Sequence, residues 1–339
     1  MKKELLWIFF VVVISLSYFK IPALISYPNY WPKPVYNFNN NPITADKILL
    51  GKVLFYDPIL SQDSTISCAS CHSSYVAFTH VDHPTSHGIN DAIGNRNAPA
   101  LFNLAWQKKF MWDGAISHLD FQVLAPIANK TEMGSDLKTV LQRVNKNKRY
   151  HELIVKAYKT EQLSGEQLLK AMAQFLLSLI SADSKYDRVR AGKEQFTEQE
   201  ATGYALFQEN CASCHTEPFF SNHDFAKNDL PINPNLNDLG RYEITKNKKD
   251  FLHFKVPSLR NIAFTYPYMH DGRFKKLADV LNHYQSGVSN GDARLPAKNH
   301  LTSRDKIDII AFLMSLSDNG FVQNKAFQFP INNFKQQNP

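Results

Sequence analysis

Cysteine is scarce in this chain, with four residues among 339. All four lie in two identical pentapeptides, Cys68-Ala-Ser-Cys-His72 and Cys211-Ala-Ser-Cys-His215. No cysteine is therefore left for a structural disulfide or for a lipid-anchored N-terminus. A Cys2His2 zinc finger is disfavoured, because no histidine pair at finger spacing follows either motif. A thioredoxin-like dithiol would not require the histidine that follows each motif.

Long hydrophobic runs are also rare, and the clearest one covers residues 5–19, after a positively charged start. This run is short for a membrane span and is ended by Lys20 and Pro22. We expect residues 1–25 to be an export signal, either cleaved or kept as an N-terminal membrane anchor, and the folded protein to be periplasmic. Residues 26–43, with prolines among aromatics and asparagines, are predicted to form an extended linker.

Two cysteines at i and i+3 followed at once by histidine form the attachment signature of c-type haem. Both thiols can reach the vinyl groups on one edge of the porphyrin, and the adjacent imidazole then points at the iron as its proximal ligand. We therefore predict two covalently bound c-type haems. The predicted thioether residues are Cys68, Cys71, Cys211 and Cys214, and the predicted proximal ligands are His72 and His215.

Charge of one sign is not concentrated in any segment, although the formal net charge is +7. The lysines are scattered and no nucleic-acid-binding motif surrounds them, so we expect no nucleic acid as a partner. Most of these lysines are expected on solvated loops and helix faces, and an acidic redox partner is the functional alternative.

The second half of the chain repeats the first, which indicates a tandem duplication of one haem domain. The segment Gly51-Lys-Val-Leu-Phe55 matches Gly203-Tyr-Ala-Leu-Phe207 before the two haem motifs. After the motifs, Met111-Trp-Asp-Gly114 matches Met269-His-Asp-Gly272. We predict a first domain at residues 44–190, a second at 191–322 and a tail at 323–339.

The fold class that we predict is mainly α, with two tandem cytochrome c-like domains, each wrapped around its haem and rich in long loops. Thr197 is expected to cap a helix through a capping box with Glu200. Strand signals are few. Apolar periodicity predicts further helices over residues 44–55, 136–144, 165–180, 277–284 and 303–316.

The order of these motifs, together with Lys255-Val-Pro-Ser-Leu-Arg-Asn261 and Tyr266-Pro-Tyr-Met-His-Asp-Gly272, resembles the bacterial di-haem cytochrome c peroxidase and MauG superfamily. The resemblance covers roughly residues 44 to 320. It implies that Trp112 lies between the two haems, and an indole there is an oxidisable relay for electrons. It also implies that Glu132 is the distal carboxylate, which moves a proton between the oxygens of bound peroxide. Gln122 and Pro126 match positions that line the same distal pocket.

The two haems should not be equivalent. Tyr284 follows His270 at the distance at which Pro126 follows Trp112, and proline cannot ligate iron whereas tyrosine can. The first haem would then be open on its distal face and the second closed. In classical peroxidases of the family methionine stands at the position of Tyr284, whereas MauG resembles this chain in having tyrosine. His283 and Met269 stay open as alternative ligands.

Two further sites follow from the resemblance. His87 is the candidate for a histidine that caps the first iron at rest, and an exposed loop histidine is the alternative reading. Asn97, Thr265 and Pro267 match residues that hold a calcium ion between the domains, where amide and carbonyl oxygens are suitable ligands.

The function that we expect is reduction of hydrogen peroxide to water at the first haem. Electrons would come from a small cytochrome c or a cupredoxin and pass through the second haem. A MauG-like oxidase acting on a protein side chain and a plain di-haem electron carrier are the alternatives. Dimers are common in the family, so a homodimer is one expected state.

Overall fold

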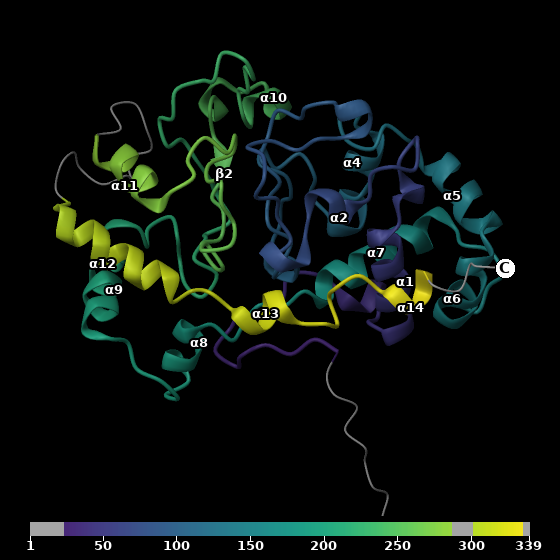
Figure 1. Ribbon diagram of the computed structural model, residues 1–339, viewed down its shortest axis with the longest axis horizontal. Coiled ribbons are helices and arrows are strands. Elements are labelled where there is room, and N and C mark those ends of the chain that lie inside the picture. Colours follow the sequence, from purple (N-terminus) through teal and green to yellow (C-terminus); the bar gives the residue numbers. More distant parts are fainter. Residues whose placement is uncertain (1–23, 287–300, 335–339) are drawn as a thin grey trace, which may run out of the picture.

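The computed structural model describes residues 24–286 and 301–334. Residues 1–23, and with them almost all of the expected export signal or membrane anchor, lie outside this part of the chain. No helix within the described residues is long and apolar enough to span a membrane. The predicted class is confirmed, because the chain forms two predominantly helical cytochrome c-type domains, which lie side by side in Figure 1.

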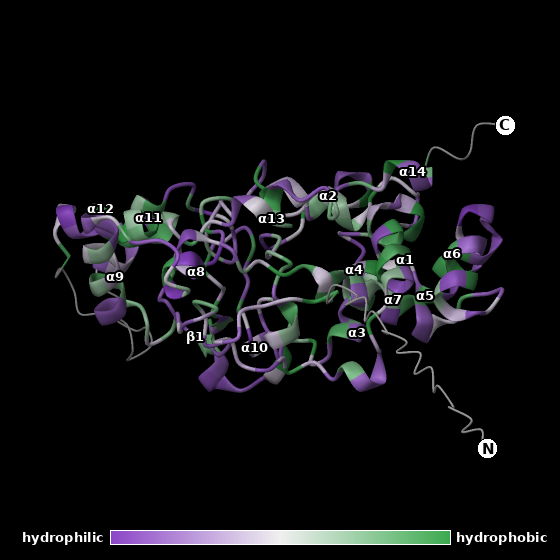
Figure 2. Cartoon of the chain, turned by 90° about the horizontal axis from the view of Figure 1, so that it is seen from below, coloured by the Kyte–Doolittle hydropathy of each residue, from purple (hydrophilic) through white to green (hydrophobic). Residues whose placement is uncertain are grey.

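The first domain is built around α1 (Ala45–Tyr56) and α7 (Gly165–Ser178), which cross and bury their contact faces. Thr44 caps α1, because its hydroxyl accepts a hydrogen bond from the Lys47 amide. The helices α5 (Leu137–Lys146) and α6 (Lys148–Tyr158) pack beside this pair. The helix α6 was not among those predicted from the sequence. Figure 2 shows α1 mainly in hydrophobic colours inside the domain and α6 with hydrophilic residues.

The second domain repeats this plan with α9 (Glu198–Asn210) crossing α12 (Ser303–Met314). Thr197 caps α9 in the predicted capping box with Glu200. The helix α11 (Leu277–Gln285) packs against α12. The only sheet among the described residues pairs β1 (Phe225–Ala226) with β2 (Phe254–Lys255) in antiparallel register.

Shorter elements complete the two domains. The α-helical ones are α2 (Cys68–Cys71), α3 (Leu119–Gln122), α4 (Leu124–Ala128), α8 (Lys185–Arg190), α10 (Tyr242–Thr245), α13 (Asn319–Gln323) and α14 (Ile331–Phe334). Single 3-10 turns cover Phe38–Asn40, Pro58–Leu60, Ser74–Val76, Ile89–Asp91, Leu104–Trp106 and Lys248–Asp250.

The repeat read in the sequence is a repeat of backbone geometry. Met111 and Met269 both adopt positive φ angles, 67° and 76°, and each opens a loop that ends in a positive-φ glycine. Asn103 and Asn261 also share a positive φ, and each donates its backbone amide to a leucine carbonyl just after the crossing helix, Leu179 and Leu316 respectively. The same local strain at matching places supports the duplication.

The N-terminal segment predicted as a linker, residues 26–43, lies against both domains. The amides of Val35 and Tyr36 bond to the Ala105 carbonyl of the first domain, at 2.9 and 3.0 Å. Tyr30 donates its hydroxyl to Asp187 of the short helix α8 at 2.7 Å. The Trp31 ring packs against Phe219 of the second domain, with ring centroids 4.9 Å apart. This segment therefore joins the domains.

The C-terminal tail returns to the first domain after α13 (Figure 1). Tyr56 donates its hydroxyl to the Phe327 carbonyl at 2.7 Å, and Lys52 donates to the Ala326 carbonyl at 2.6 Å. The tail thus covers α1 of the first domain.

Candidate haem sites and their surroundings

The first haem motif forms a single helical turn, α2, with His72 as the residue that ends it. The His72 ring donates from Nδ1 to the Phe78 carbonyl at 2.9 Å. This bond leaves Nε2 as the nitrogen able to ligate a metal and fixes the direction of the ring. Burial lowers the pKa of His72 to about 4, so the imidazole is neutral, as a ligand must be.

The second motif has the same arrangement. His215 donates from Nδ1 to the Phe220 carbonyl at 3.0 Å, and burial lowers its pKa. Phe78 and Phe220 both have positive φ angles, which turn their carbonyls toward the rings. Two independent motifs thus prepare a histidine in the same way, as expected for proximal iron ligands.

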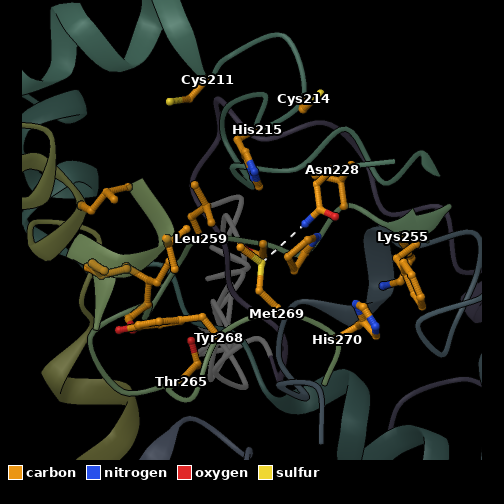
Figure 3. Close-up of a pocket in the computed structure, with 18 of the residues that line it drawn as sticks. Cys211, Cys214, His215, Asn228, Lys255, Leu259, Thr265, Tyr268, Met269 and His270 are labelled. Atoms are coloured by element: carbon orange, nitrogen blue, oxygen red, sulfur yellow. Dashed lines mark hydrogen bonds between the residues drawn. The ribbon is translucent and has the colours of Figure 1, made fainter. Parts of the chain in front are cut away.

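A cavity of about 250 Å³ opens in front of His215, Cys211 and Cys214 (Figure 3). Its far wall comes from helices α9, α11 and α12 and is apolar, with Phe207, Leu281, Ile309 and Leu313. Its near wall comes from the first domain and includes polar side chains, Asn97, Gln107 and Trp112. A porphyrin has an apolar body and carboxylates on one edge, so the chemistry of these walls fits a haem.

Tyr284 and Met269 both line this cavity. Burial raises the pKa of Tyr284 to about 12, with a hydrogen bond to Asn228 acting in the opposite direction. The Asn228 amide also donates to the Met269 sulfur at 3.5 Å (Figure 3). Nε2 of His283 instead donates a hydrogen bond to the Asn228 backbone carbonyl at 2.9 Å, so this nitrogen is already engaged. Asn228, which the sequence analysis did not identify, thus contacts all three candidate ligands.

Glu132 faces the first haem motif. Burial, and then the nearby Glu132 carboxylate, raise the pKa of the Cys71 thiol. Burial raises the pKa of Glu132 as well, while a 2.8 Å hydrogen bond from Asn129 opposes this shift. The amide of Met133 bonds to the Pro126 carbonyl at 3.2 Å and so holds Glu132 beside α4.

Gln122 ends α3 and turns toward the loop that carries Trp112. Its amide lies 3.6 Å from the sulfur of Met111, the residue before Trp112. The loop around Glu132 and the loop around Trp112 are therefore both held by the short helices α3 and α4.

His87 belongs to a row of three loop histidines. Its ring stacks on His83 with centroids 4.3 Å apart, and His83 stacks on His80 at 5.3 Å. The His87 carbonyl lies 3.7 Å from the Cys71 sulfur, so the loop borders the first motif. Ligation of iron by His87 stays a prediction.

Trp112 lies at the junction of the domains and lines the cavity in front of His215. Its indole donates to the Asn97 carbonyl at 2.9 Å, and its own carbonyl accepts from the Lys255 amide at 2.7 Å. Asn97 in turn donates its backbone amide to the His270 carbonyl at 2.7 Å. The residue predicted as a relay is thus held by both domains.

The three residues predicted to hold calcium, Asn97, Thr265 and Pro267, line the same cavity. Asn97 donates its side-chain amide to the Pro84 carbonyl at 3.0 Å, which directs its carbonyl oxygen away from that contact. Oxygen atoms of this kind suit Ca²⁺. No group of three acidic, histidine or cysteine side chains among the described residues is arranged around a metal position.

Arg96 links the two domains next to this region. Its guanidinium pairs with Asp113 of the first domain and forms a bidentate pair with Asp238 of the second, at 2.6 and 2.8 Å. Paired donors of this kind fix geometry as well as charge. This pairing was not predicted from the sequence, because nothing in the local pattern joins Arg96 to Asp238.

The fold and the two prepared histidines define a di-haem c-type cytochrome. A family model described as di-haem cytochrome c peroxidase matches residues 45–195, and a cytochrome c model matches residues 200–317. The chain belongs to the di-haem cytochrome c peroxidase and MauG family. Membership in this family implies two c-type haems.

Relatives of both kinds are found. The methylamine utilization protein MauG of Methylophilus methylotrophus is 32% identical over 313 residues, covering 89% of this chain and 90% of the relative. The cytochrome c551 peroxidase of Nitrosomonas europaea is 34% identical over 295 residues, covering 86% and 84%. A solved MauG-like protein associated with microbial copper homeostasis has a TM-score of 0.82 at 29% identity, covering 90% of this chain and 98% of that one.

Proposed function

We propose that the protein is a periplasmic di-haem peroxidase that reduces hydrogen peroxide to water at the haem of the first motif. The observation that carries this proposal is the half-buried Glu132, which lies beside Cys71 of the first motif. The loop of Glu132 is bonded to Pro126 of α4, and a proline supplies no ligand to iron. Relatives named cytochrome c peroxidase, at 34% identity in one case, support it. A haem iron with an open position supplies the binding and cleavage of peroxide.

Glu132 is proposed to move the proton. Heterolytic cleavage of peroxide requires a base that takes a proton from one oxygen and returns it to the other. Asn129 holds one oxygen of the carboxylate, so the other is left to face the substrate. Gln122, which is placed beside Met111, would help to orient the bound peroxide.

Tyr284 is proposed to close the second haem. It lines the cavity in front of His215, whereas Nε2 of His283 is occupied by the Asn228 carbonyl. A phenolate ligand stabilises the ferric and higher states, so this haem would store an oxidising equivalent. Trp112, held between Asn97 and Lys255, would relay electrons between the two sites.

The remaining parts of the proposal concern partners. Electrons would come from a small cytochrome c or a cupredoxin that docks on the second domain. Asn97, Thr265 and Pro267 would hold one calcium ion at the junction, which would keep the relay in place. Because c-type haem is attached outside the cytoplasmic membrane, the folded chain would be periplasmic.

Peroxide turnover by the haem-loaded protein tests this proposal. We expect reduced small cytochrome c to accelerate the consumption of hydrogen peroxide, and Glu132→Gln to abolish most of that acceleration at unchanged haem content. Turnover that does not respond to the donor would contradict the peroxidase assignment.

A MauG-like oxidase is the second candidate, favoured by Tyr284 in the cavity and by 32% identity to a MauG protein. Such an enzyme would spend the same oxidising equivalents on a protein side chain. Retention of those equivalents for minutes in the presence of reduced cytochrome c would favour this candidate over the first.

A further inference from the structure

Lys255 presents a positive charge at the wall of the second haem cavity. Its side chain lines the cavity, and Figure 3 shows the amine turned toward the interior. Its hydrogen-bond partner is neutral, the Gln107 side-chain oxygen of the first domain, at 2.7 Å. Among residues 24–286 and 301–334, no carboxylate forms an ion pair with it. The titratable group near it is His223, and burial, followed by the Lys255 charge, lowers the pKa of His223 to about 4, so this imidazole is neutral.

A cation in such a place is costly unless an anion accompanies it. Removal of water lowers the pKa of Lys255 to about 8, and no acidic group of the described chain opposes this shift. The chain nevertheless holds the lysine at both ends, because its backbone amide bonds to the Trp112 carbonyl at 2.7 Å and its amine donates to the Gln107 side-chain oxygen at 2.7 Å. A fixed ammonium without a counter-charge from the protein indicates that the molecule bound in the cavity supplies the anion.

The position of Lys255 indicates which part of the bound haem would supply this anion. Gln107, Trp112 and Lys255 meet on the first-domain side, whereas Leu281, Ile309 and Leu313 form the opposite wall. An amphipathic porphyrin attached through Cys211 and Cys214 would place its apolar body against the helices. Its carboxylate edge would then face the domain junction.

We propose that Lys255 holds a propionate carboxylate of the second haem at the domain junction, next to Trp112, and thereby sets the reduction potential of that haem. Gln107 would orient the ammonium from the first domain. The ion pair would keep the propionate ionised, and the positive charge would favour the reduced iron over the oxidised one. Lys255 is thus a positioning residue, since it would act through the haem and not on the substrate.

Redox titration of the haem-loaded protein, without peroxide or donor, tests this inference separately from the proposed function. Lys255→Met removes the charge and keeps the apolar stem, and Lys255→Arg keeps the charge. Lys52→Met is the matched control, because Lys52 is also partly buried and donates to a neutral oxygen, the Ala326 carbonyl of the tail. A Cys211→Ser/Cys214→Ser variant assigns the two potentials to the two motifs.

We expect Lys255→Met to lower the potential of the second haem and to make it pH-dependent near neutrality, as the orphaned carboxylate takes up a proton. Lys255→Arg and Lys52→Met should keep the potential and the pH profile of the unmodified protein. An unchanged second potential in Lys255→Met would overturn the inference.

The unmodified protein provides a second test that does not depend on the folding of any variant. An ammonium held by a carboxylate keeps its proton, so the second potential should not change as the pH rises through 8. A fall in potential above about pH 8, where an unpaired Lys255 would deprotonate, would also overturn the inference.

Discussion

Gly51 and Gly203 occupy equivalent places in two copies of one helix crossing. A methyl group on Gly51 would overlap the Ala171 carbonyl of α7, and one on Gly203 would overlap the Asp308 carbonyl of α12. The duplication thus preserves the contact that builds each domain. The differences lie around the haem sites, where Trp112 corresponds to His270 and Pro126 to Tyr284.

Alanine at either glycine should destabilise its own domain. Backbone atoms cannot move aside as a flexible side chain can, so Gly51→Ala and Gly203→Ala are each expected to cost about 1–3 kcal/mol or more. Gly320→Ala is the control, because a methyl group there would meet nothing closer than Asp318 at 3.5 Å. Thermal unfolding of the haem-loaded protein measures the effect. An unchanged unfolding midpoint in both variants would show that the two crossing helices can move apart to make room for the methyl group.

Removal of the Glu132 carboxylate should remove proton transfer. We expect Glu132→Gln to slow peroxide turnover by roughly 10²–10⁴-fold, the usual contribution of a positioned general base. Glu152→Gln, which removes an exposed glutamate of α6, is the control for charge. Stopped-flow measurement of peroxide consumption decides, and equal rates in both variants would remove Glu132 from the mechanism.

The pH profile carries a further signature of Glu132. Burial raises the pKa of Glu132, and only the ionised form can accept a proton. Activity should therefore be lost, as the pH falls, at a higher pH than an exposed glutamate would give. An acidic limb that is identical in Glu132→Gln would assign the limb to another group.

Loss of the Trp112 indole should slow electron transfer between the two haems. Trp112→Phe keeps an aromatic ring but removes the oxidisable indole and its bond to the Asn97 carbonyl. Trp106→Phe is the control, since Trp106 is also an interior tryptophan, buried more deeply than Trp112, but bonds to the Pro32 carbonyl of the N-terminal segment. Pulse-reduction kinetics report the rate, and equal rates in both variants would exclude Trp112 as the relay.

The buried pair of Arg260 and Asp187 should stabilise the fold in a pH-dependent way. Burial alone would raise the pKa of Asp187, but the Arg260 guanidinium, bound at 2.8 Å through both nitrogens, lowers it below the ordinary value. The stabilisation is therefore complete above the unfolded pKa near 4 and is lost as the pH falls through the lower folded pKa.

Arg260→Gln should cost about 3–5 kcal/mol, because it leaves a buried carboxylate unpaired. Lys156→Gln breaks the Lys156–Glu152 pair of α6, whose side chains are 57% and 71% exposed, and it should cost about 1 kcal/mol or less. Denaturant unfolding at pH 7 compares the two. Equal losses would mean that the pair with Asp187 contributes no more than a surface contact.

Local patterns predicted the local parts of the molecule. Thr197 caps a helix where expected, and the long helices other than α6 end within about two residues of the predicted positions. The repeat was readable because matching residues, such as Asn103 and Asn261, repeat the same strained backbone.

Contacts across the domains could not be read in this way. The bonds from Arg96 to Asp238 and from Lys255 to Gln107 join residues that no periodicity relates. The N-terminal segment looked like a linker from its prolines, yet Trp31 is only 4% exposed. Its indole packs 5.0 Å from that of Trp106, a contact decided by tertiary packing.

The central claim is that two identical attachment motifs hold two unlike haems, with the second closed by Tyr284. Paired optical and electron-spin spectra of the oxidised, haem-loaded protein and of Tyr284→Phe test it most directly. We predict two distinct iron signals, of which only the one assigned to His215 changes in the variant. Two equivalent irons, or spectra that Tyr284→Phe leaves unchanged, would contradict the account.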